Sequence, residues 1–145
     1  MDINRMFNYN TTRLEKDCSL LISTLGKRLT WKWDDRFETV LAEFSVTDKE
    51  KIHIDLTRHM GKIWAHDQDA SPPRVVQTII DYFGGLNPGQ TLLTSNPNQD
   101  GLLLCAWWPW GNGKTISIRL GVFADSLSDQ DNEELTRLFR GWFDV

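Results

Sequence analysis

The chain has 145 residues, of which 40% are hydrophobic and 25% are charged, and its formal net charge is −4. This composition excludes a wholly disordered chain, because disordered chains lack the apolar residues needed for a core. It also argues against a binder of duplex nucleic acid, since the sequence has no cluster of lysine and arginine to neutralise phosphates. The length fits one domain over residues 1–145, which would bury roughly two thirds of the surface of its unfolded chain.

The terminus and the two cysteines predict the compartment. The N-terminal residues are polar, and no apolar run reaches the roughly 18 residues that a membrane span requires. Cys18 and Cys105 lie in apolar segments, and a disulfide framework or a zinc site needs more ligands at closer spacing. We therefore expect buried free thiols in a cytoplasmic protein, with no membrane partner.

The first element predicted is an N-terminal helix. Apolar residues recur at spacings of three, four and seven, which is typical of a helix with one buried face. Thr12 and Glu15 fit a capping box, which places the firm start of the helix there. Gly26 follows the last apolar residue, where a left-handed cap is expected. The apolar positions are Phe7, Leu14, Cys18, Leu21, Ile22 and Leu25.

From Arg28 the apolar period changes to two, which predicts strands. The first carries Leu29, Trp31 and Trp33 on one face. A second covers residues 39–46, with a helix over residues 35–44 as the alternative. A third strand is expected where Ile52, Ile54 and Leu56 alternate with polar residues, and residues 62–65 continue that sheet after an irregularity.

The second half of the chain begins with the clearest helix, over residues 71–83. Ser71 is a suitable N-cap, the two following prolines are tolerated in a first turn, and Gly84 with Gly85 ends the helix. A short strand over residues 91–94 and a loop over residues 96–101 come next.

Two long strands, over residues 102–108 and 115–123, flank the turn Gly111-Asn112-Gly113 and predict a hairpin. Ser128 begins a last helix with an acidic first turn. The fold class is therefore α+β: a mostly antiparallel sheet of about six strands with three helices, in the order α-βββ-α-βββ-α.

No motif in the sequence indicates catalysis or metal binding. Gly113-Lys114-Thr115 is no phosphate loop, because Trp108 stands where the motif needs a glycine and a strand follows where it needs a helix. His53, His59 and His66 are spaced too widely for a typical zinc site. No nucleophile with a positioned base is identifiable. We expect no catalytic residue, no cofactor and no metal.

Seven tryptophans are the most unusual feature of the composition, and three of them lie in Trp107-Trp108-Pro109-Trp110. Tryptophan is enriched where proteins bind partners. Successive side chains of a strand alternate, so Trp107 and Trp108 must point to opposite faces. Either both faces of the sheet are covered, or an apolar face is left to bind another chain; three helices for about six strands make full cover difficult.

The order of elements resembles the class I chaperones of type III secretion systems. Three stretches carry the resemblance: Lys62-Ile63-Trp64-Ala65 leading through Ser71-Pro72-Pro73 into the helix over 75–83, then Gly101-Leu102-Leu103-Leu104, and finally Ile116-Ser117-Ile118-Arg119-Leu120 with Leu127 and Asp129. The resemblance implies an acidic, cytoplasmic homodimer without enzymatic activity. Such a protein would hold a segment of a secreted effector in extended, partly strand-added form.

The residues that we expect to contact a partner come from the first strands and the hairpin. They are Leu29, Trp31, Trp33, Phe44, Ile54, Trp107, Trp108 and Trp110. The hairpin or the central helix would supply the homodimer contact. An immunity or antitoxin protein that blocks a toxin is an alternative, because such proteins are also small, acidic and without motifs. A second alternative is a small-molecule binder or enzyme with an aromatic pocket formed by Trp107, Trp108 and Trp110.

Overall fold

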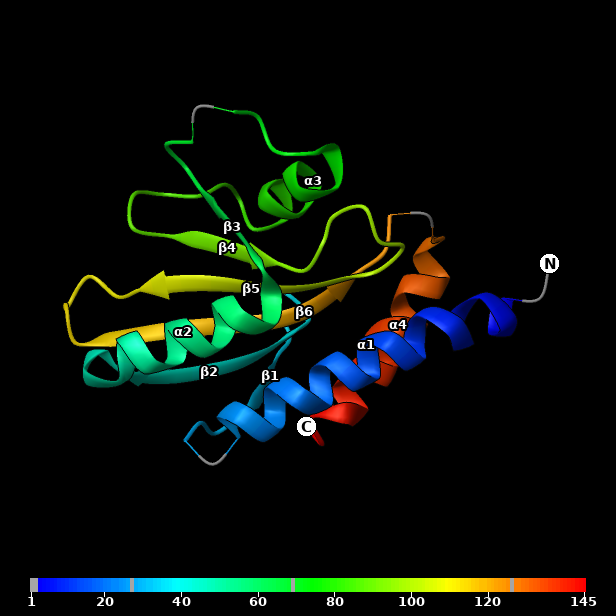
Figure 1. Ribbon diagram of the computed structural model, residues 1–145, viewed down its shortest axis with the longest axis horizontal. Helices are drawn as coiled ribbons and strands as arrows, with labels where there is room; N and C mark the ends of the chain where they lie inside the picture. The colour runs from blue at the N-terminus through cyan, green and yellow to red at the C-terminus, as the bar shows by residue number, and fades with distance from the viewer. Residues whose placement is uncertain (1–2, 27, 69, 126) are drawn as a thin grey trace.

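A computed structural model describes residues 3–26, 28–68, 70–125 and 127–145. The described chain forms an antiparallel six-stranded sheet with the strand order β1-β2-β6-β5-β4-β3 (Figure 1). This confirms the α+β class, with four α-helices where the sequence predicted three. In chain order the elements are α1 (Ile3–Leu25), β1 (Lys32–Asp34), β2 (Thr39–Ser45), a 3₁₀ turn (Val46–Asp48), α2 (Lys49–Met60), β3 (Lys62–Ala65), α3 (Arg74–Tyr82), β4 (Thr91–Thr94), β5 (Leu102–Pro109), β6 (Thr115–Phe123) and α4 (Asp129–Trp142).

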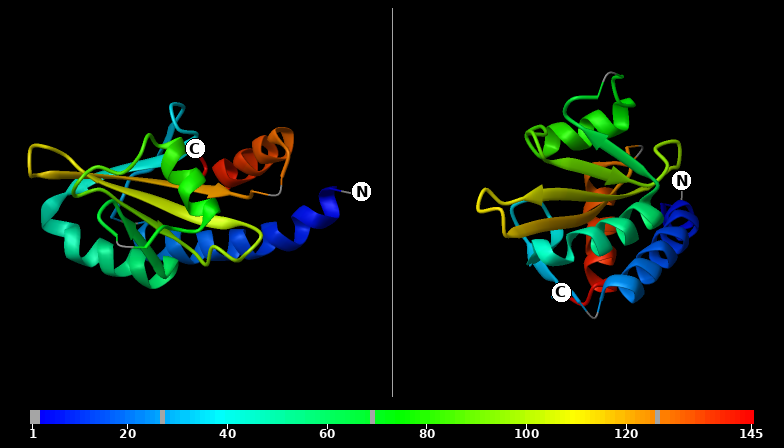
Figure 2. Two further views of the ribbon diagram at one scale, coloured as in Figure 1. Left: turned by 90° about the horizontal axis from the view of Figure 1, so that it is seen from above. Right: turned by 60° about the vertical axis from the view of Figure 1, so that its left-hand side comes forward.

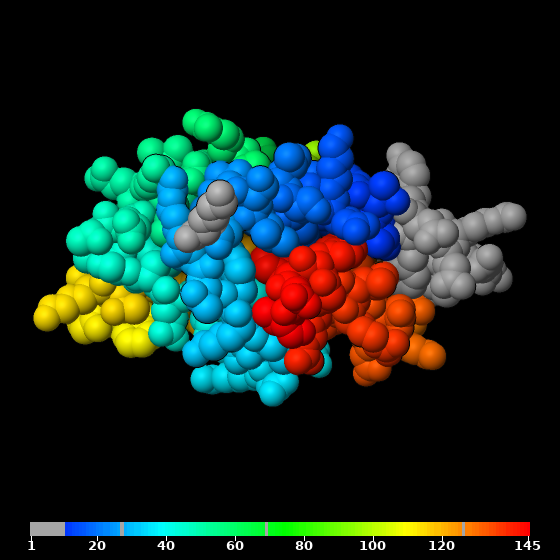
Figure 3. Space-filling view, turned by 90° about the horizontal axis from the view of Figure 1, so that it is seen from below, coloured from blue at the N-terminus to red at the C-terminus, as the bar shows by residue number. Residues whose placement is uncertain are grey.

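One face of the sheet, called here the closed face, packs against α1, α2 and α4. Figure 2 shows α1 and α2 along the same side of the sheet, and Figure 3 shows α4 beside α1. Alternate residues of β2, β5 and β6 point to this face and meet the apolar stripes of the three helices. Leu14, Cys18 and Leu21 of α1 and Phe139 of α4 are all almost completely buried. The larger core of the protein therefore lies here.

The opposite face, called here the open face, is covered by α3 at one end. Val76 and Ile79 of α3 pack against Leu92 of β4 and against Leu102 and Leu104 of β5, forming a second, smaller core. The hydrophobic stripe of α3 is strong but the helix has only nine residues. The helix therefore covers the strands β4 and β5. The part of the open face formed by β1, β2 and β6 lies beyond its reach.

The third strand predicted from residues 52–56 is wrong, because this segment belongs to α2. Ile52, Leu56 and Met60 are buried at a spacing of four, while Ile54 between them is 56% exposed. The helix ends at Gly61, which takes a left-handed conformation with φ of 93°. Residues 62–65 form a strand as predicted, but on the far edge of the sheet.

The starts of two helices also differ from the sequence predictions. α1 already runs from Ile3, so Thr12 lies inside the helix and does not begin it. α3 begins at Arg74, with Pro73 in the capping position and no side-chain cap from Ser71. Gly26 ends α1 as predicted, but without a positive φ. A Cβ there would clash with the Ile22 carbonyl oxygen, which explains the glycine.

Other sequence predictions are confirmed. The hairpin of β5 and β6, the short strand β4 and the strand nature of residues 39–45 are all present, so the alternative helix over residues 35–44 is excluded. The first strand is shorter than predicted and starts at Lys32. Ser128 caps α4 by accepting a hydrogen bond from the Asp131 amide.

The two cysteines are free and buried, as expected, and burial raises the pKa of both thiols. Among the helices of the described residues, none combines the length and the apolar character that crossing a membrane would require.

Candidate partner-binding face

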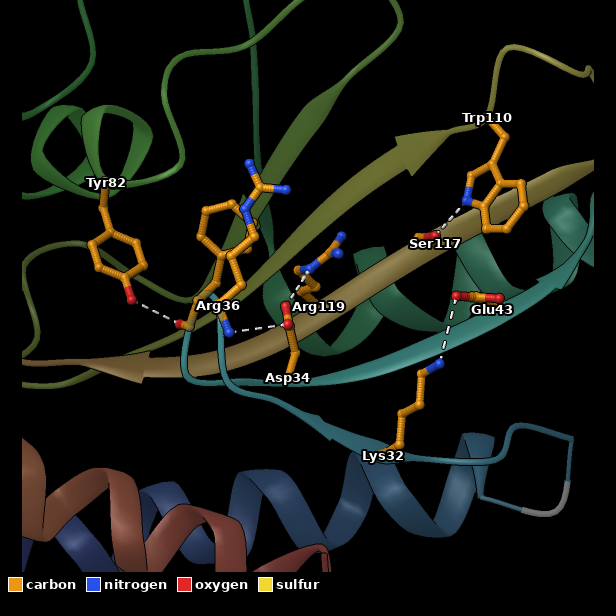
Figure 4. Close-up of polar contacts among 9 residues, drawn as sticks. Lys32, Asp34, Arg36, Glu43, Tyr82, Trp110, Ser117 and Arg119 are labelled. Atoms are coloured by element: carbon orange, nitrogen blue, oxygen red, sulfur yellow. Dashed lines mark hydrogen bonds and ion pairs between the residues drawn. The ribbon is translucent and has the colours of Figure 1, made fainter.

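An aromatic cluster lies on the open face, between the β1–β2 turn and the end of α3. The ring centroid of Phe37 in the turn lies 5.1 Å from that of Phe83, 6.1 Å from that of Tyr82 and 5.6 Å from that of Trp108. The Tyr82 hydroxyl donates a hydrogen bond of 2.9 Å to the Phe37 carbonyl oxygen (Figure 4). Edge-to-face ring contacts and this hydrogen bond fix the turn to α3, although Tyr82 remains 54% exposed.

Arg119 projects from the middle of β6 onto the open face and joins this cluster. Its guanidinium carbon lies 4.5 Å from the ring centroid of Trp108 and 5.4 Å from that of Phe37. Its Nε donates to a carboxylate oxygen of Asp34 at 2.7 Å (Figure 4). Both side chains are mostly buried, so water screens this ion pair only weakly. The pair is neutral as a whole and anchors β1 to β6.

A cavity of about 330 Å³ opens beside the aromatic cluster. Gly121 of β6 contributes to its depth, because a Cβ there would lie only 3.2 Å from the Thr39 methyl group and 3.4 Å from the side chain of Leu104. The cavity is bounded by the β1–β2 turn, α3, β6 and the first half of α4. Its lining consists of Phe37, Glu38, Thr39, Ile79, Tyr82, Phe83, Leu104, Gly121, Val122, Phe123, Asp129, Asn132, Glu133 and Thr136.

The charged residues in this lining are all acidic. Glu38 follows the aromatic residue of the β1–β2 turn, while Asp129 and Glu133 lie one turn apart on α4. All three are exposed, and across the described ranges none of them forms an ion pair or a side-chain hydrogen bond. The α4 N-terminus offers a favourable dipole to Asp129. Burial raises the pKa of Tyr82, and the nearby Glu38 and Asp34 raise it further. We call the cavity with these three carboxylates the acidic groove.

The opposite end of the open face is polar and carries the last tryptophan of the hairpin. The Trp110 indole donates to the Ser117 hydroxyl, and Lys32 lies 3.9 Å from Glu43 (Figure 4). Trp110 is 42% exposed. Its nitrogen is satisfied within the chain, so this residue presents mainly its apolar ring to solvent.

The structure does not bring the eight expected contact residues together. Leu29, Phe44 and Trp107 are buried in the core of the closed face. Trp31 and Trp33 are partly buried against α4, where Trp31 contacts the Phe143 ring at 5.2 Å and the Arg140 guanidinium lies 4.8 Å from the Trp33 ring. These five residues form part of the hydrophobic core or its border.

The other three expected residues are accessible but lie apart. Trp108 belongs to the aromatic cluster, Trp110 lies at the far end of the hairpin, and Ile54 projects from α2, on the closed side of the sheet. Trp107 and Trp108 point to opposite faces, as the strand alternation predicted. A pocket formed jointly by Trp107, Trp108 and Trp110 is therefore absent.

Sequence reasoning missed the residues that surround the acidic groove. Phe37 had a detectable signal, since it is a large aromatic residue between the polar residues Asp34-Asp35-Arg36 and Glu38. Tyr82 had a weaker one, as a polar aromatic beside the buried stripe of its helix. No sequence signal marked the three carboxylates, because Glu38, Asp129 and Glu133 resemble ordinary turn and helix-terminus residues.

Among the described residues, the histidines and cysteines do not line this groove. His53 packs its ring against Trp107 at 4.9 Å on the closed face, and burial, with Lys49 nearby, lowers its pKa. Within the described residues there is no group of three or more histidine, cysteine or acidic side chains that could hold a metal ion. The groove thus offers apolar, aromatic and acidic surface, which is suited to binding.

Comparison of this chain with protein-family models, with curated proteins and with solved structures gave no match.

Proposed function

We propose that the protein is a non-enzymatic binding module that holds a segment of another protein on the open face of its sheet. The observation that supports this is the partial cover of that face: α3 protects one end only, and an aromatic cluster beside a cavity stays accessible. Accessible aromatic residues beside a cavity are typical of protein-binding surfaces. We favour a cytoplasmic secretion chaperone that holds an effector segment, the function implied by the resemblance to class I chaperones.

A photo-cross-linking experiment tests this proposal in the native host. Tyr82 is replaced by the photoreactive amino acid p-benzoylphenylalanine, which keeps an aromatic ring at this exposed position and loses only the hydroxyl that donates to Phe37. The matched control carries the same residue at Ile54, which is equally exposed but on the α2 side. We expect a polypeptide adduct, identified by mass spectrometry, from position 82 and none from position 54. Absence of any adduct at position 82, or identical adducts at both positions, would contradict the proposal.

The homodimer is a further part of this proposal. Light scattering after size exclusion measures the mass directly, and a dimer would have twice the 16.8 kDa of the chain. A strict monomer would count against the secretion-chaperone form, while leaving a protein-binding module of another kind.

An immunity protein that blocks a toxin is the second candidate, and the unpaired carboxylates of the acidic groove favour it. An acidic surface is complementary to a basic toxin site and speeds association. The two candidates differ in the state of the partner. A secretion chaperone binds an isolated, extended segment of the cross-linked protein, whereas an immunity protein binds only the folded toxin and abolishes its activity.

A further inference from the structure

We propose that the acidic groove binds a cationic segment, in which a lysine or arginine lies beside apolar residues. This inference rests on the proposed function and specifies the chemistry of the partner. It commits to a polypeptide with positive charge and not to a second copy of the chain.

The charge of the groove is the first argument. The three carboxylates reach the cavity from two different elements, Glu38 from the β1–β2 turn and Asp129 and Glu133 from α4. Among the described residues that line the cavity, no cation lies opposite them. The neighbouring arginines do not fill that role. Arg119 is held by Asp34 at 2.7 Å, and Arg36 stacks on the Phe37 ring with its guanidinium carbon 4.9 Å from the centroid. A cationic side chain in the cavity would meet carboxylates and no competing positive charge, so it has the complementary sign.

The floor of the groove is the second argument. Leu104, Val122 and Phe123 provide apolar surface, so a purely hydrophilic cation would leave this area in contact with water. Thr39 lines the same cavity and is only 3% exposed, yet within the described chain its hydroxyl oxygen has no hydrogen-bond partner. An unpaired buried hydroxyl costs free energy, so the cavity wall holds an unsatisfied polar position beside its apolar floor.

Size and net charge select the occupant. A cavity of about 330 Å³ lies at the lower end of ligand pockets, which span roughly 300–1,000 Å³, so it accommodates side chains of a segment and not a folded element. A second copy carries the same acidic groove and the same net charge of −4, so two copies meeting at this face would repel. A foreign segment of opposite charge has the complementary properties.

The proposal is tested with a random peptide library displayed on phage, selected on the intact protein and counter-selected on the E38Q/E133Q variant. We expect enriched peptides with lysine or arginine adjacent to leucine, isoleucine, valine or an aromatic residue. Fluorescence anisotropy then measures the affinity of one enriched peptide for the wild type and for the variants. Enrichment of acidic or uncharged sequences, or no enrichment at all, would overturn the proposal.

The E15Q/E50Q variant is the matched control, since it removes the same charge from exposed glutamates of α1 and α2. We expect E38Q/E133Q to weaken binding of the enriched peptide roughly tenfold and E15Q/E50Q to change it less than about twofold, with weaker binding at high salt. Equal losses in both variants would show attraction to the overall charge and would overturn the groove as the site.

A blocking variant tests the cavity independently of charge. Thr136→Trp places a large ring at the cavity wall on α4, where the native side chain is half-buried. We expect it to abolish peptide binding while circular dichroism and thermal unfolding show a folded chain. If that variant does not fold, Thr136→Met serves in its place.

Two outcomes separate this inference from the proposed function. A polypeptide adduct at position 82 together with charge-independent peptide binding would overturn the cationic preference and leave the binding module intact. Displacement of the enriched peptide by spermidine at comparable concentration, with no polypeptide adduct, would assign the groove to small organic cations and overturn both.

Discussion

The two faces of the sheet are formed by the same strands but differ in how they are buried. The closed face meets three helices, and its residues join one continuous core that includes Leu93, Cys105 and Leu120. The open face is covered by α3 at one end and is bordered by the start of α4, and its centre holds Arg119 and Asp34 among aromatic rings. A face that is completely buried contributes mainly stability, whereas a partly covered face with charges at its margin is free to contact other molecules.

Trp107 and Trp108 give the sharpest test of this difference, because they are adjacent in β5 and point to opposite faces. We expect Trp107→Ala to lower the free energy of unfolding by about 4 kcal/mol, since it leaves a large cavity in the closed face. Trp108→Ala should cost about 2 kcal/mol, because Trp108 is only partly buried and mainly its contacts with Phe37, Phe83 and Arg119 are lost.

Urea unfolding followed by circular dichroism measures both losses. Trp107→Phe is the milder variant to use if Trp107→Ala does not fold, and it should fall between wild type and alanine. Equal costs for the two alanine variants would mean that the faces are equally buried, contrary to the structure.

The ion pair of the open face should have the next largest effect. Arg119→Ala leaves the Asp34 carboxylate mostly buried without its partner and removes the cation from the Trp108 ring, so we expect a loss of about 2 kcal/mol. Arg119→Lys should recover about half, because lysine keeps the charge but lacks the planar group. A double-mutant cycle with Asp34→Ala isolates the pair energy by urea unfolding. Additive losses would show that the two residues do not interact.

Gly61 tests the assignment of residues 49–60 to a helix on the closed side. Gly61→Ala forces a Cβ into a left-handed conformation with φ of 93° after α2, and we expect a loss of about 1 kcal/mol. The control is Gly141→Ala: this glycine lies within α4, has no positive φ and has no neighbouring atom within 4 Å of an added Cβ. Alanine there should raise stability by up to about 1 kcal/mol. A neutral or stabilising effect at Gly61 would instead fit a strand running through this position.

The same segment shows where sequence patterns are sufficient and where they fail. The hairpin was predictable because the alternation of β5 and β6 and their Gly-Asn-Gly turn agree with each other. Residues 52–60 satisfy two periods at once: Ile52, Ile54 and Leu56 alternate, while Ile52, Leu56 and Met60 repeat every four residues. Only tertiary packing decides between them, and it leaves Ile54 exposed.

The acidic groove was not predictable for a different reason. Phe37 and Tyr82 are 45 residues apart in the chain, and Glu133 is farther still. No period or local spacing relates them, because their proximity depends on how α3 and α4 meet the β1–β2 turn. The tryptophans, which are visible in the sequence, turned out to be divided between the two faces.

The smallest expected effect concerns His53, which packs its ring against Trp107 on the closed side. Burial, and then the nearby Lys49, lower its pKa in the folded chain below the unfolded value of 6.5. As the pH falls from 6.5 toward the folded pKa, the unfolded chain therefore binds more protons than the folded chain does. The stability contributed by neutral His53 is complete above pH 6.5 and is lost as the pH falls through that window. We expect the difference in unfolding free energy between about pH 8 and about pH 5 to be smaller in His53→Gln than in wild type. His66→Gln, at an exposed position, should keep the wild-type difference. An unchanged pH dependence in His53→Gln would show that water reaches this ring and that the closed face is less completely sealed along α2.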